Sequence, residues 1–177
     1  LNGGNVSGQK TSYDVTTEAF TLPTPTRNGY TFTGWTGTGL SSATKTVTVA
    51  KGSTGNRSYT ANWSANKYTV SYNGNGGSGS MSQDTATYGE SYTAKANSFS
   101  RPGYTFAGWN ESADGKSSDW TSWIGKPWTW TYTRSITLYA QWTKNTYSIS
   151  YNLNGGNVSG QKTSYDVTTE AFTLPTP

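Results

Sequence analysis

The stretch R-N-G-Y-T-F-T-G-W at residues 27–35 decides the fold, and it returns as R-P-G-Y-T-F-A-G-W at residues 101–109. In each copy Tyr and Phe lie two positions apart, so their rings share one face of a strand. The glycine before the tryptophan removes a side chain where another backbone or ring must come close. We interpret these rings as the core of a small β module, with surface binding as the alternative. The predicted core residues are Tyr30, Phe32, Trp35, Trp63, Tyr104, Phe106, Trp109 and Trp142.

Two other segments recur around this motif. The strand pattern S-Y-T-A-N-W at residues 58–63 returns as T-L-Y-A-Q-W at residues 137–142. The pattern Y-T-V-S-Y at residues 68–72 returns as Y-S-I-S-Y at residues 147–151, and an Asn-Gly-Gly turn follows both copies. These repeats predict module A at residues 1–65, which lacks its first strand, module B at residues 66–143, and the start of module C at residues 144–177.

A longer repeat encloses these modules, because residues 153–177 are identical to residues 1–25. Packing alone does not demand such identity, since hydrophobic cores tolerate many substitutions. The chain is therefore interpreted as part of a tandem array whose copies were recently duplicated or homogenised. Arrays build stalks, filaments or extended binding surfaces, so we expect an elongated array of modules.

Strand patterns fill the segments between the turns. Residues 46–49 and 136–142 alternate apolar and polar side chains with a period of two, which is typical of half-buried strands. Turn chemistry separates such segments at Asn75-Gly76-Gly77, Pro102-Gly103 and Asp114-Gly115. No segment shows a sustained helical period. We therefore predict a mainly β fold with little or no helix.

The composition indicates an extracellular location at a cell surface. Aromatic residues make up 15% of the chain, and there is no cysteine to form a disulfide or a thiolate metal site. The polar residues are mostly Thr, Ser, Asn and Gly, which suits an exported protein. The net charge of +4 comes from scattered residues without a Lys/Arg cluster, so we predict no nucleic-acid partner. No apolar run approaches the ~20 residues that span a bilayer, so we predict no direct membrane insertion of this segment.

The order of these motifs resembles the Listeria–Bacteroides repeat, also called the InlB B-repeat family. The shared features are the Asn-Gly-Gly turn, the R-x-G-Y-T-F-x-G-W motif and the closing strand with its tryptophan. The resemblance covers module B fully, module A except its first strand, and the start of module C. It implies tandem β-grasp-like modules on surface proteins of bacteria and some archaea, and it implies no particular ligand. The tryptophan-rich insertion of module B departs from the family pattern.

The chain lacks the residues on which most catalysis depends. His and Cys are absent, which removes the commonest general base and the thiol nucleophile. The nine acidic residues are mostly single and lie beside turns. Asn110, Ser112 and Asp114 are spaced as at the start of a calcium loop, but Thr121 stands where that loop needs Glu. We predict no catalytic residue, no cofactor, no metal site and no enzymatic activity.

Four tryptophans crowd one segment of module B, namely Trp120, Trp123, Trp128 and Trp130. Exposed Trp rings form flat apolar platforms for sugar rings, so a carbohydrate-binding adhesin module with surface glycans as partners is the alternative function. The competing interpretation is that this insertion packs over its own module or a neighbouring one. Asn-x-Ser sequons, which are candidate N-glycosylation sites, occur at Asn5, Asn56, Asn62, Asn110 and Asn157.

The order of the strands raises one further hypothesis. Module C supplies the first strand of its module at residues 147–152 and then repeats residues 1–25, whereas module A starts after the corresponding position. An open sheet edge accepts a strand from another chain, which would let copies complement each other head to tail. The alternative is a continuous array in which both ends are fragment boundaries. We predict a non-enzymatic structural repeat region of an extracellular cell-surface adhesin, stalk or filament, whose partners are neighbouring copies or adjacent repeats.

Overall fold

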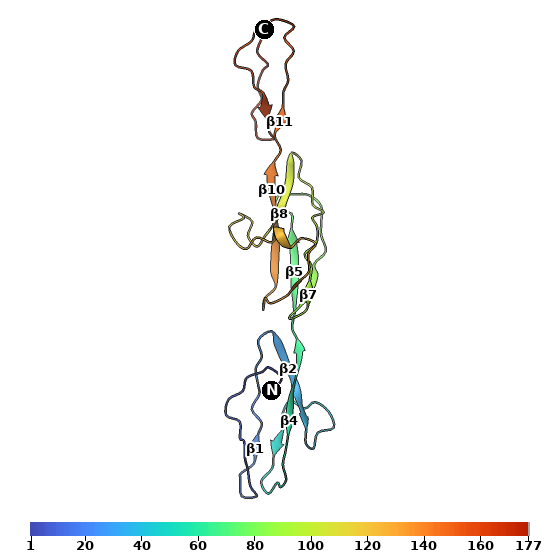
Figure 1. Ribbon diagram of the computed structural model, residues 1–177, viewed down its shortest axis with the longest axis vertical. Helices are drawn as coiled ribbons and strands as arrows, with labels where there is room; N and C mark the ends of the chain where they lie inside the picture. Colours follow the sequence, from blue (N-terminus) through green and yellow to red (C-terminus); the bar gives the residue numbers. More distant parts are fainter. Residues whose placement is uncertain (177) are drawn as a thin grey trace. The chain divides into compact units, whose positions relative to one another are not determined.

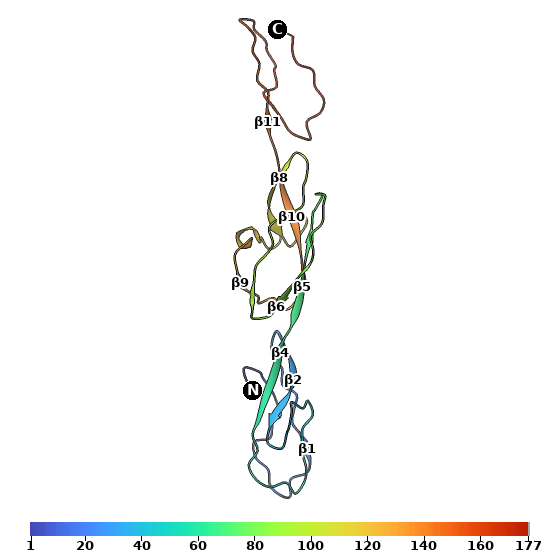
Figure 2. The same cartoon turned by 90° about the vertical axis from the view of Figure 1, so that its right-hand side faces the viewer.

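The computed structural model describes residues 1–176 (Figures 1 and 2). Its regular structure is almost entirely strand, and the helical part of the described residues is one short 3-10 helix, η1 at Thr121–Trp123. The prediction of a mainly β fold is therefore confirmed. The strands are β1 (Phe20–Thr21), β2 (Tyr30–Gly37), β3 (Thr48–Val49), β4 (Tyr59–Ala65), β5 (Lys67–Asn73), β6 (Asp84–Thr87), β7 (Ser91–Tyr92), β8 (Tyr104–Asn110), β9 (Trp128–Thr129), β10 (Ile136–Lys144), β11 (Tyr147–Ser148) and β12 (Ser164–Tyr165).

The described chain divides into two compact units, which we treat separately. The first unit contains residues 1–69, 85–92 and 128–135, and the second contains the remainder of the described chain. The first unit thus combines module A with three segments of module B, residues 66–69, 85–92 and 128–135, and the last two contribute β7 and β9. The units and the sequence modules have different boundaries, because a sequence repeat records duplication whereas a compact unit records contacts.

In the first unit, β2 and β4 form an antiparallel pair that runs from Tyr30 opposite Ala65 to Gly37 opposite Tyr59. A bulge interrupts this pair at Gly34, whose φ is +141°. A Cβ at Gly34 would collide with the backbone of Thr44. That backbone comes close because the Thr44 N–H and carbonyl bond the main chain of Trp35 at 3.0 and 2.8 Å. The glycine before the tryptophan is therefore required by a close backbone approach.

The core of the first unit forms on the inner face of this pair. Trp35, Val47 and Ala61 are buried there. Each reaches the core from a different segment, since Val47 precedes β3 and the other two lie on β2 and β4. Partly buried apolar side chains close over them, namely Leu22, Phe32, Leu40, Tyr59 and Trp63.

Module B is built on a four-stranded sheet with the order β6-β5-β10-β8. The inner strand β10 pairs in parallel with β5, from Ile136 opposite Val70 to Tyr139 opposite Asn73. Its other edge pairs with β8 antiparallel, ending with Lys144 opposite Tyr104. The first and last strands of the module are therefore adjacent and point in the same direction. In the second unit, the fully buried side chains on these strands include Val70, Trp109, Leu138 and Ala140.

The last part of the second unit has little regular structure. Strands β11 and β12 pair over two residues, with Tyr147 opposite Tyr165 and Ser148 opposite Ser164. Both tyrosine rings remain exposed. Since so short a hairpin buries little surface, it depends on few interactions.

The R-x-G-Y turn has the same backbone anchor in both units. In the first unit the Asn66 N–H donates to the Gly29 carbonyl at 2.9 Å, and the Asn66 side chain accepts from the Thr31 hydroxyl at 2.6 Å. In the second unit Asn145 makes the equivalent bonds, to the Gly103 carbonyl at 2.8 Å and from the Thr105 hydroxyl at 2.6 Å. The turn thus fixes the first residues after each closing strand.

Candidate functional site

In the first unit, two predicted core rings, Trp35 and Trp63, pack around a third, Phe32. Its ring centroid lies 5.4 Å from that of Trp35 and 5.5 Å from that of Trp63, both in edge-to-face geometry. This geometry is favourable for aromatic pairs. The Trp63 indole N–H donates to the Leu1 carbonyl at 3.0 Å, which ties the glycine turn to the closing strand.

The second unit repeats this arrangement around Phe106. The Phe106 centroid lies 5.0 Å from that of Trp109 and 5.8 Å from that of Trp142. The Trp142 indole N–H donates to the Gly74 carbonyl at 2.9 Å. In each unit Trp35 or Trp109 is buried, while the Phe and the second Trp are partly buried.

The remaining two predicted core rings lie at the edge of these clusters. An arginine guanidinium covers each ring, because Arg27 stands 3.8 Å from the Tyr30 centroid and Arg101 stands 4.0 Å from the Tyr104 centroid. Such cation–π contacts stabilise partly exposed rings. The Arg that occurs in both copies of the R-x-G-Y pattern therefore has a contact that the sequence pattern alone does not reveal.

The tryptophan cluster is divided between the core and the surface. Trp120 and Trp130 are only 2% and 0% exposed, Trp128 is partly buried, and Trp123 is 45% exposed. Trp128 and Trp130 lie in the first unit with Tyr92, whose ring centroid is 5.9 and 5.2 Å from theirs. A sugar ring would reach the face of Trp123 more readily than those of the buried pair. The glycan contact stays a prediction, and this burial favours the packing interpretation for Trp120 and Trp130.

The sequon asparagines also differ in their surroundings. Asn5, Asn56 and Asn157 are exposed. The Asn62 amide donates to the Gly34 carbonyl at 3.1 Å, and Asn110 is 4% exposed with its amide bonded to two carbonyls. A glycan on Asn62 or Asn110 would break these bonds, so exposed sequons are the more accessible candidates. Modification of all five stays a prediction.

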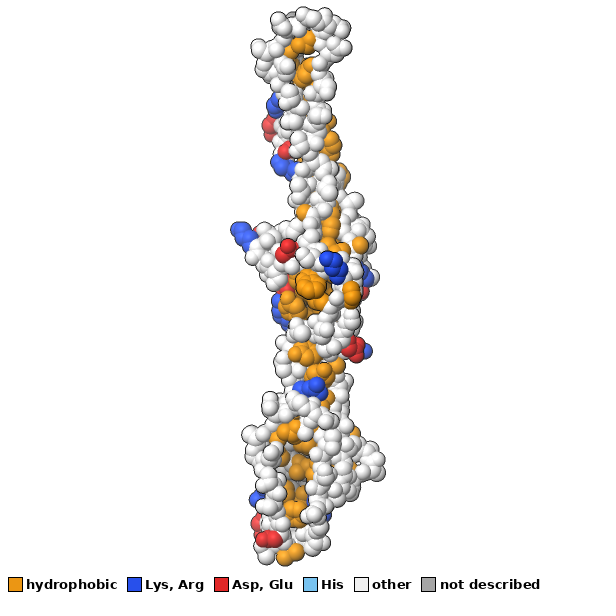
Figure 3. Space-filling view, viewed as in Figure 1, with side chains coloured by type: hydrophobic (Ala, Val, Ile, Leu, Met, Phe, Trp, Pro, Cys, Tyr) orange, Lys and Arg blue, Asp and Glu red, His pale blue; other side chains and the backbone are white. Residues whose placement is uncertain are grey.

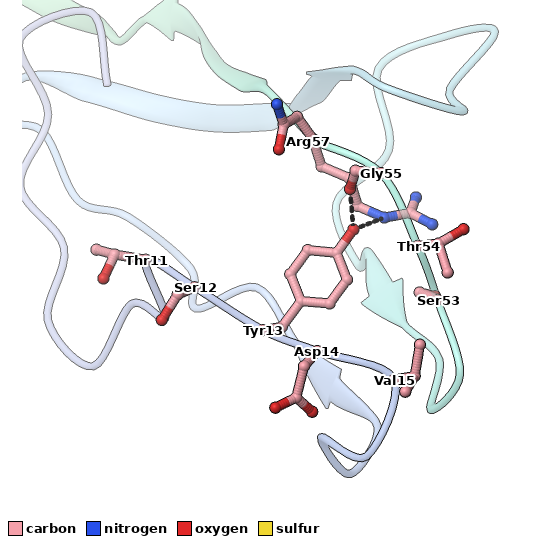
Figure 4. Close-up of a pocket in the computed structure, with 10 residues that line it drawn as sticks. Thr11, Ser12, Tyr13, Asp14, Val15, Ser53, Thr54, Gly55 and Arg57 are labelled. Atoms are coloured by element: carbon pink, nitrogen blue, oxygen red, sulfur yellow. Dashed lines mark hydrogen bonds between the residues drawn. The ribbon is translucent and has the colours of Figure 1, made fainter.

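A groove that the sequence did not predict lies in the first unit, between the segment of residues 11–13 and the start of β4. Its outer part, about 580 Å³, is lined by residues 11–15 and 53–57 (Figure 4). There the Tyr13 hydroxyl donates to the Gly55 carbonyl and accepts from the Arg57 guanidinium at 3.1 Å. We call it the Tyr13–Tyr59 groove, since Tyr59 lines its inner part.

The inner part of the Tyr13–Tyr59 groove has both polar and apolar walls. Two cavities of about 270 and 100 Å³ share Lys10, Thr11, Leu22 and Tyr59 in their walls, and the larger one reaches Trp35. Apolar side chains are also visible in a hollow of this module, at the bottom of Figure 3. The buried indole N–H of Trp35 has no hydrogen-bond partner, whereas that of Trp109 donates to the Lys95 carbonyl at 3.0 Å. Trp35 in the first unit therefore lacks the indole hydrogen bond that Trp109 makes in the second unit.

Several of the acidic residues accept hydrogen bonds within their own turns. Hydrogen bonds from the Thr16 hydroxyl and backbone N–H hold the pKa of the Asp14 carboxyl below its ordinary value. The Thr121 side chain lowers the pKa of Asp119 in the same way. Asp166 has a pKa well below its ordinary range, first because Lys144 lies 2.8 Å away and second because Thr168 donates to it. Each carboxylate is thus held ionised as a local structural acceptor.

No group of three or more His, Cys, Asp or Glu side chains is placed to hold a metal ion within residues 1–176. No helix in that part of the chain is long and apolar enough to cross a membrane.

The fold and its paired motifs define a tandem β-repeat protein. Residues 68–141 match the Listeria-Bacteroides repeat domain, and residues 1–67 match the divergent InlB B-repeat domain. The chain belongs to this repeat family, as its motifs predicted, and it is a repeat region of the kind that surface proteins carry.

Several curated proteins are similar to this chain. A Gly-rich membrane protein of Evansella cellulosilytica is 32% identical over 167 residues, covering 85% of this chain and 18% of that protein. A second membrane protein of that organism is 33% identical, covering 86% and 21%. Internalin H of Listeria monocytogenes is 32% identical, covering 80% and 24%. The chain spans less than a quarter of the length of each of these relatives. No solved structure matches it.

Proposed function

We propose that this chain is a non-enzymatic, load-bearing repeat region of an extracellular cell-surface adhesin, stalk or filament. The observation that carries the proposal is the parallel pairing of β5 with β10. The chain enters module B through β5 and leaves it through β10. Tension on the two ends of the module therefore pulls these neighbouring strands past each other along their length.

This direction of pulling matters because of hydrogen-bond geometry. The bonds between β5 and β10 run across the strands, so sliding the strands loads all of them together. Peeling the strands from one end would instead break the bonds one at a time. The buried Val70 and Leu138 side chains would also have to leave the core before the strands separate. A small module of this topology should therefore need a high force to unfold when it is pulled from its two ends.

The carboxylates support the non-enzymatic part of the proposal. Asp14 and Asp119 each accept hydrogen bonds from the threonine two residues later. These hydrogen bonds explain why a carboxylate stands at each of the two turns, so no substrate is needed to explain them. The absence of His and Cys from the sequence removes the usual partners of such carboxylates in catalysis.

Forced unfolding between engineered cysteines tests the load-bearing role, because the chain has no cysteine of its own. Exposed positions at the ends of β5 and β10, Lys67→Cys and Thr143→Cys, apply the sliding geometry. The matched control keeps Lys67→Cys and replaces Thr143 by Thr133→Cys, which lies just before β10 and applies the peeling geometry. We expect a several-fold higher unfolding force for the first pair. Equal forces would contradict the proposal, since forced unfolding reports the barrier along the pulled direction.

A carbohydrate-binding module is the second candidate, favoured by the exposed face of Trp123. Titration with a panel of polysaccharides should then shift the tryptophan fluorescence of the parent chain but not that of Trp123→Ala. An unchanged response in the variant would remove Trp123 from the candidate site.

A further inference from the structure

A second groove of the first unit lies beside the β2–β4 strand pair. It is lined by aromatic rings of these two strands and by residues 24–28 and 45–46. Its volume is about 730 Å³, which falls within the ~300–1,000 Å³ that is usual for small-molecule sites. We call it the Lys45 groove. Its size makes it a candidate binding site, and the chemistry of its walls indicates the class of ligand.

Three aromatic rings line the Lys45 groove. Tyr30 and Phe32 share one face of β2, and Trp63 stands opposite Phe32 on β4. The ring centroids of Phe32 and Trp63 are 5.5 Å apart. All three rings are only partly buried, so each leaves apolar surface for a ligand. The C–H groups of a sugar ring pack on surfaces of this kind.

Exposed polar side chains line the same groove as the rings. Four of them are threonines and one is an amide, namely Thr24, Thr26, Thr31, Thr46 and Asn28. A threonine hydroxyl both donates and accepts hydrogen bonds, as does each hydroxyl of a sugar. Apolar surface with a few polar groups around it is typical of small-molecule sites, and this combination suits a carbohydrate.

The charged residues that line the Lys45 groove are both basic, namely Arg27 and Lys45. Within residues 1–176 neither of them forms an ion pair with a carboxylate, whereas Lys51 of the same unit pairs with Glu18. The Arg27 guanidinium stays beside the groove because it stacks on the Tyr30 ring. A groove with two cations and no acidic side chain in its walls favours an anionic ligand.

The corresponding residues of module B have other side chains. Phe99 stands at the position of Pro25 and packs on Trp109, with ring centroids 6.2 Å apart. Thr121 stands at the position of Lys45, since each follows the residue whose backbone bonds the buried tryptophan. The ammonium group is therefore a feature of module A rather than of the shared repeat motif.

The Lys45 groove is separate from the side of the core that the first strand of a module covers. In module B that strand is β5, and its Tyr72 ring lies 5.1 Å from Trp109. The counterpart of Trp109 is Trp35, which lines a different cavity. Trp35 is not among the residues that line the Lys45 groove.

We propose that the Lys45 groove binds an acidic carbohydrate through a carboxylate-bearing sugar residue. The sugar ring packs on Phe32 and Trp63, and its carboxylate pairs with the Lys45 ammonium. The Arg27 guanidinium adds to the positive potential of the groove, and the threonines bond the sugar hydroxyls. Charge complementarity selects this ligand over a neutral sugar.

Binding at this groove goes beyond the load-bearing role, because a module can bear tension without holding a sugar. The groove is also distinct from the candidate carbohydrate contact at Trp123. All residues that line the groove belong to the first unit, whereas Trp123 belongs to the second. Substitutions can therefore separate the two sites.

Titration of the full chain with an oligogalacturonate, followed by NMR, tests the proposal. We expect the indole N–H signal of Trp63 to shift and that of Trp123 to stay in place. The methyl-esterified form of the same oligosaccharide keeps the sugar rings but loses the charge, and it should bind about tenfold more weakly or worse. Equal binding of the two forms, or an oligogalacturonate that leaves Trp63 unshifted, would overturn the proposal.

Substitution of Lys45 tests the role of its charge. Lys45 is exposed, so Lys45→Gln should keep the fold while its affinity for the oligogalacturonate falls about tenfold. Lys45→Arg keeps the charge and should bind nearly as the parent does.

Lys51→Gln is the matched control, because Lys51 is an exposed lysine of the same unit that does not line the groove. It should bind the oligogalacturonate as the parent does. An equal loss in Lys45→Gln and Lys51→Gln would mean that net charge alone attracts the sugar, which would contradict a site at Lys45.

Two further measurements separate this ligand and this site from their alternatives. A short oligoglutamate peptide carries carboxylates without sugar rings, and we expect it to leave the Trp63 signal in place. A peptide that binds as tightly as the oligogalacturonate with the same Trp63 shift would overturn the assignment to a carbohydrate. Trp123→Ala should bind the oligogalacturonate as the parent does, and a loss in that variant would place the sugar at Trp123 instead.

Discussion

Residues 1–25 and 153–177 have the same sequence, but residues 1–24 and 153–176 have different structural surroundings. In the first unit Phe20 and Thr21 form β1 against β3, and the Leu22 side chain packs on the core. The corresponding Phe172 and Leu174 are exposed and lie outside any strand. The same amino-acid sequence thus packs on a core in the first unit and is exposed to solvent in the second.

The turns of the two copies, in contrast, are the same. Asn2 and Asn154 have positive φ angles of 49° and 44°. The Asp14 carboxylate accepts from the Thr16 N–H at 2.8 Å, and Asp166 accepts from the Thr168 N–H at 2.7 Å. Turns are therefore encoded by a few neighbouring residues, whereas strands and core positions need a partner from elsewhere in the chain.

Removal of the Trp35 ring should remove most of the difference in amide protection between Leu22 and its counterpart Leu174. Trp35→Ala removes a buried ring and should cost ~3–5 kcal/mol of stability. The Leu22 amide, now bonded to the Val47 carbonyl at 2.9 Å, should then exchange with solvent as fast as the Leu174 amide. Hydrogen exchange measures both amides in one sample. Trp123→Ala, at an exposed ring, is the control, and a Leu22 amide that stays protected in Trp35→Ala would contradict this account.

Replacing the same leucine in each copy tests the comparison more directly. Leu22→Ala removes a partly buried side chain from the core and should cost ~1–2 kcal/mol, which is below the ~2–5 kcal/mol of a fully buried leucine. Leu174→Ala should change stability by less than ~0.5 kcal/mol. Urea unfolding followed by tryptophan fluorescence gives both values. Equal losses would mean that both copies contribute to a core.

A methyl group at Gly103 should perturb Val167 and leave its counterpart Val15 unchanged. Gly103 has φ +74°, and a Cβ there would collide with Val167, the counterpart of Val15. Gly103→Ala should cost about 1–2 kcal/mol from the left-handed backbone alone. The methyl NMR signals of Val167 should shift while those of Val15 stay in place. Shifts at both valines would show that the effect spreads beyond the local contact.

The smallest expected difference between the copies is in how the carboxyl groups of Asp14 and Asp166 titrate. Lys144 lowers the pKa of Asp166, whereas Asp14 depends on Thr16 and Thr17 without a lysine. Because the folded pKa lies below the ordinary 3.8, the stabilisation is present above that pH and is lost as pH falls through the folded pKa. Carboxyl NMR titration should show a higher pKa for Asp166 in Lys144→Met and an unchanged pKa for Asp14. An unshifted Asp166 would remove Lys144 as the main cause. The pair is exposed to solvent, so its loss should change global stability very little.

Several features of the fold and the site could be predicted from residue patterns. The alternation in residues 136–142 indicated β10, and the spacing of Tyr104 and Phe106 placed both rings on one side of β8. The R-x-G-Y-T-F-x-G-W motif identified the repeat family. Such features depend on neighbours within a few residues, which a pattern records directly.

Other features depended on contacts between distant segments. The burial of Trp130 requires Tyr92 beside it, and the engagement of the Asn62 amide requires the Gly34 carbonyl across the strand pair. The residues around Tyr13 do not indicate that it lines a groove, because a local sequence does not show whether a strand lies beside it. Only the comparison of residues 11–13 with residues 163–165 and their partner strand could have suggested it.

The sequence by itself determined where this chain turns, where it extends and which aromatic rings recur in register, because these properties follow from local sterics and side-chain spacing. Tertiary structure decided which strands pair. It brought β5 and β10 together in parallel, buried Leu22 but not Leu174, and formed a groove beside Tyr13. Two identical segments reach different states because strand pairing and burial are properties of the partner segments as well as of the segment itself.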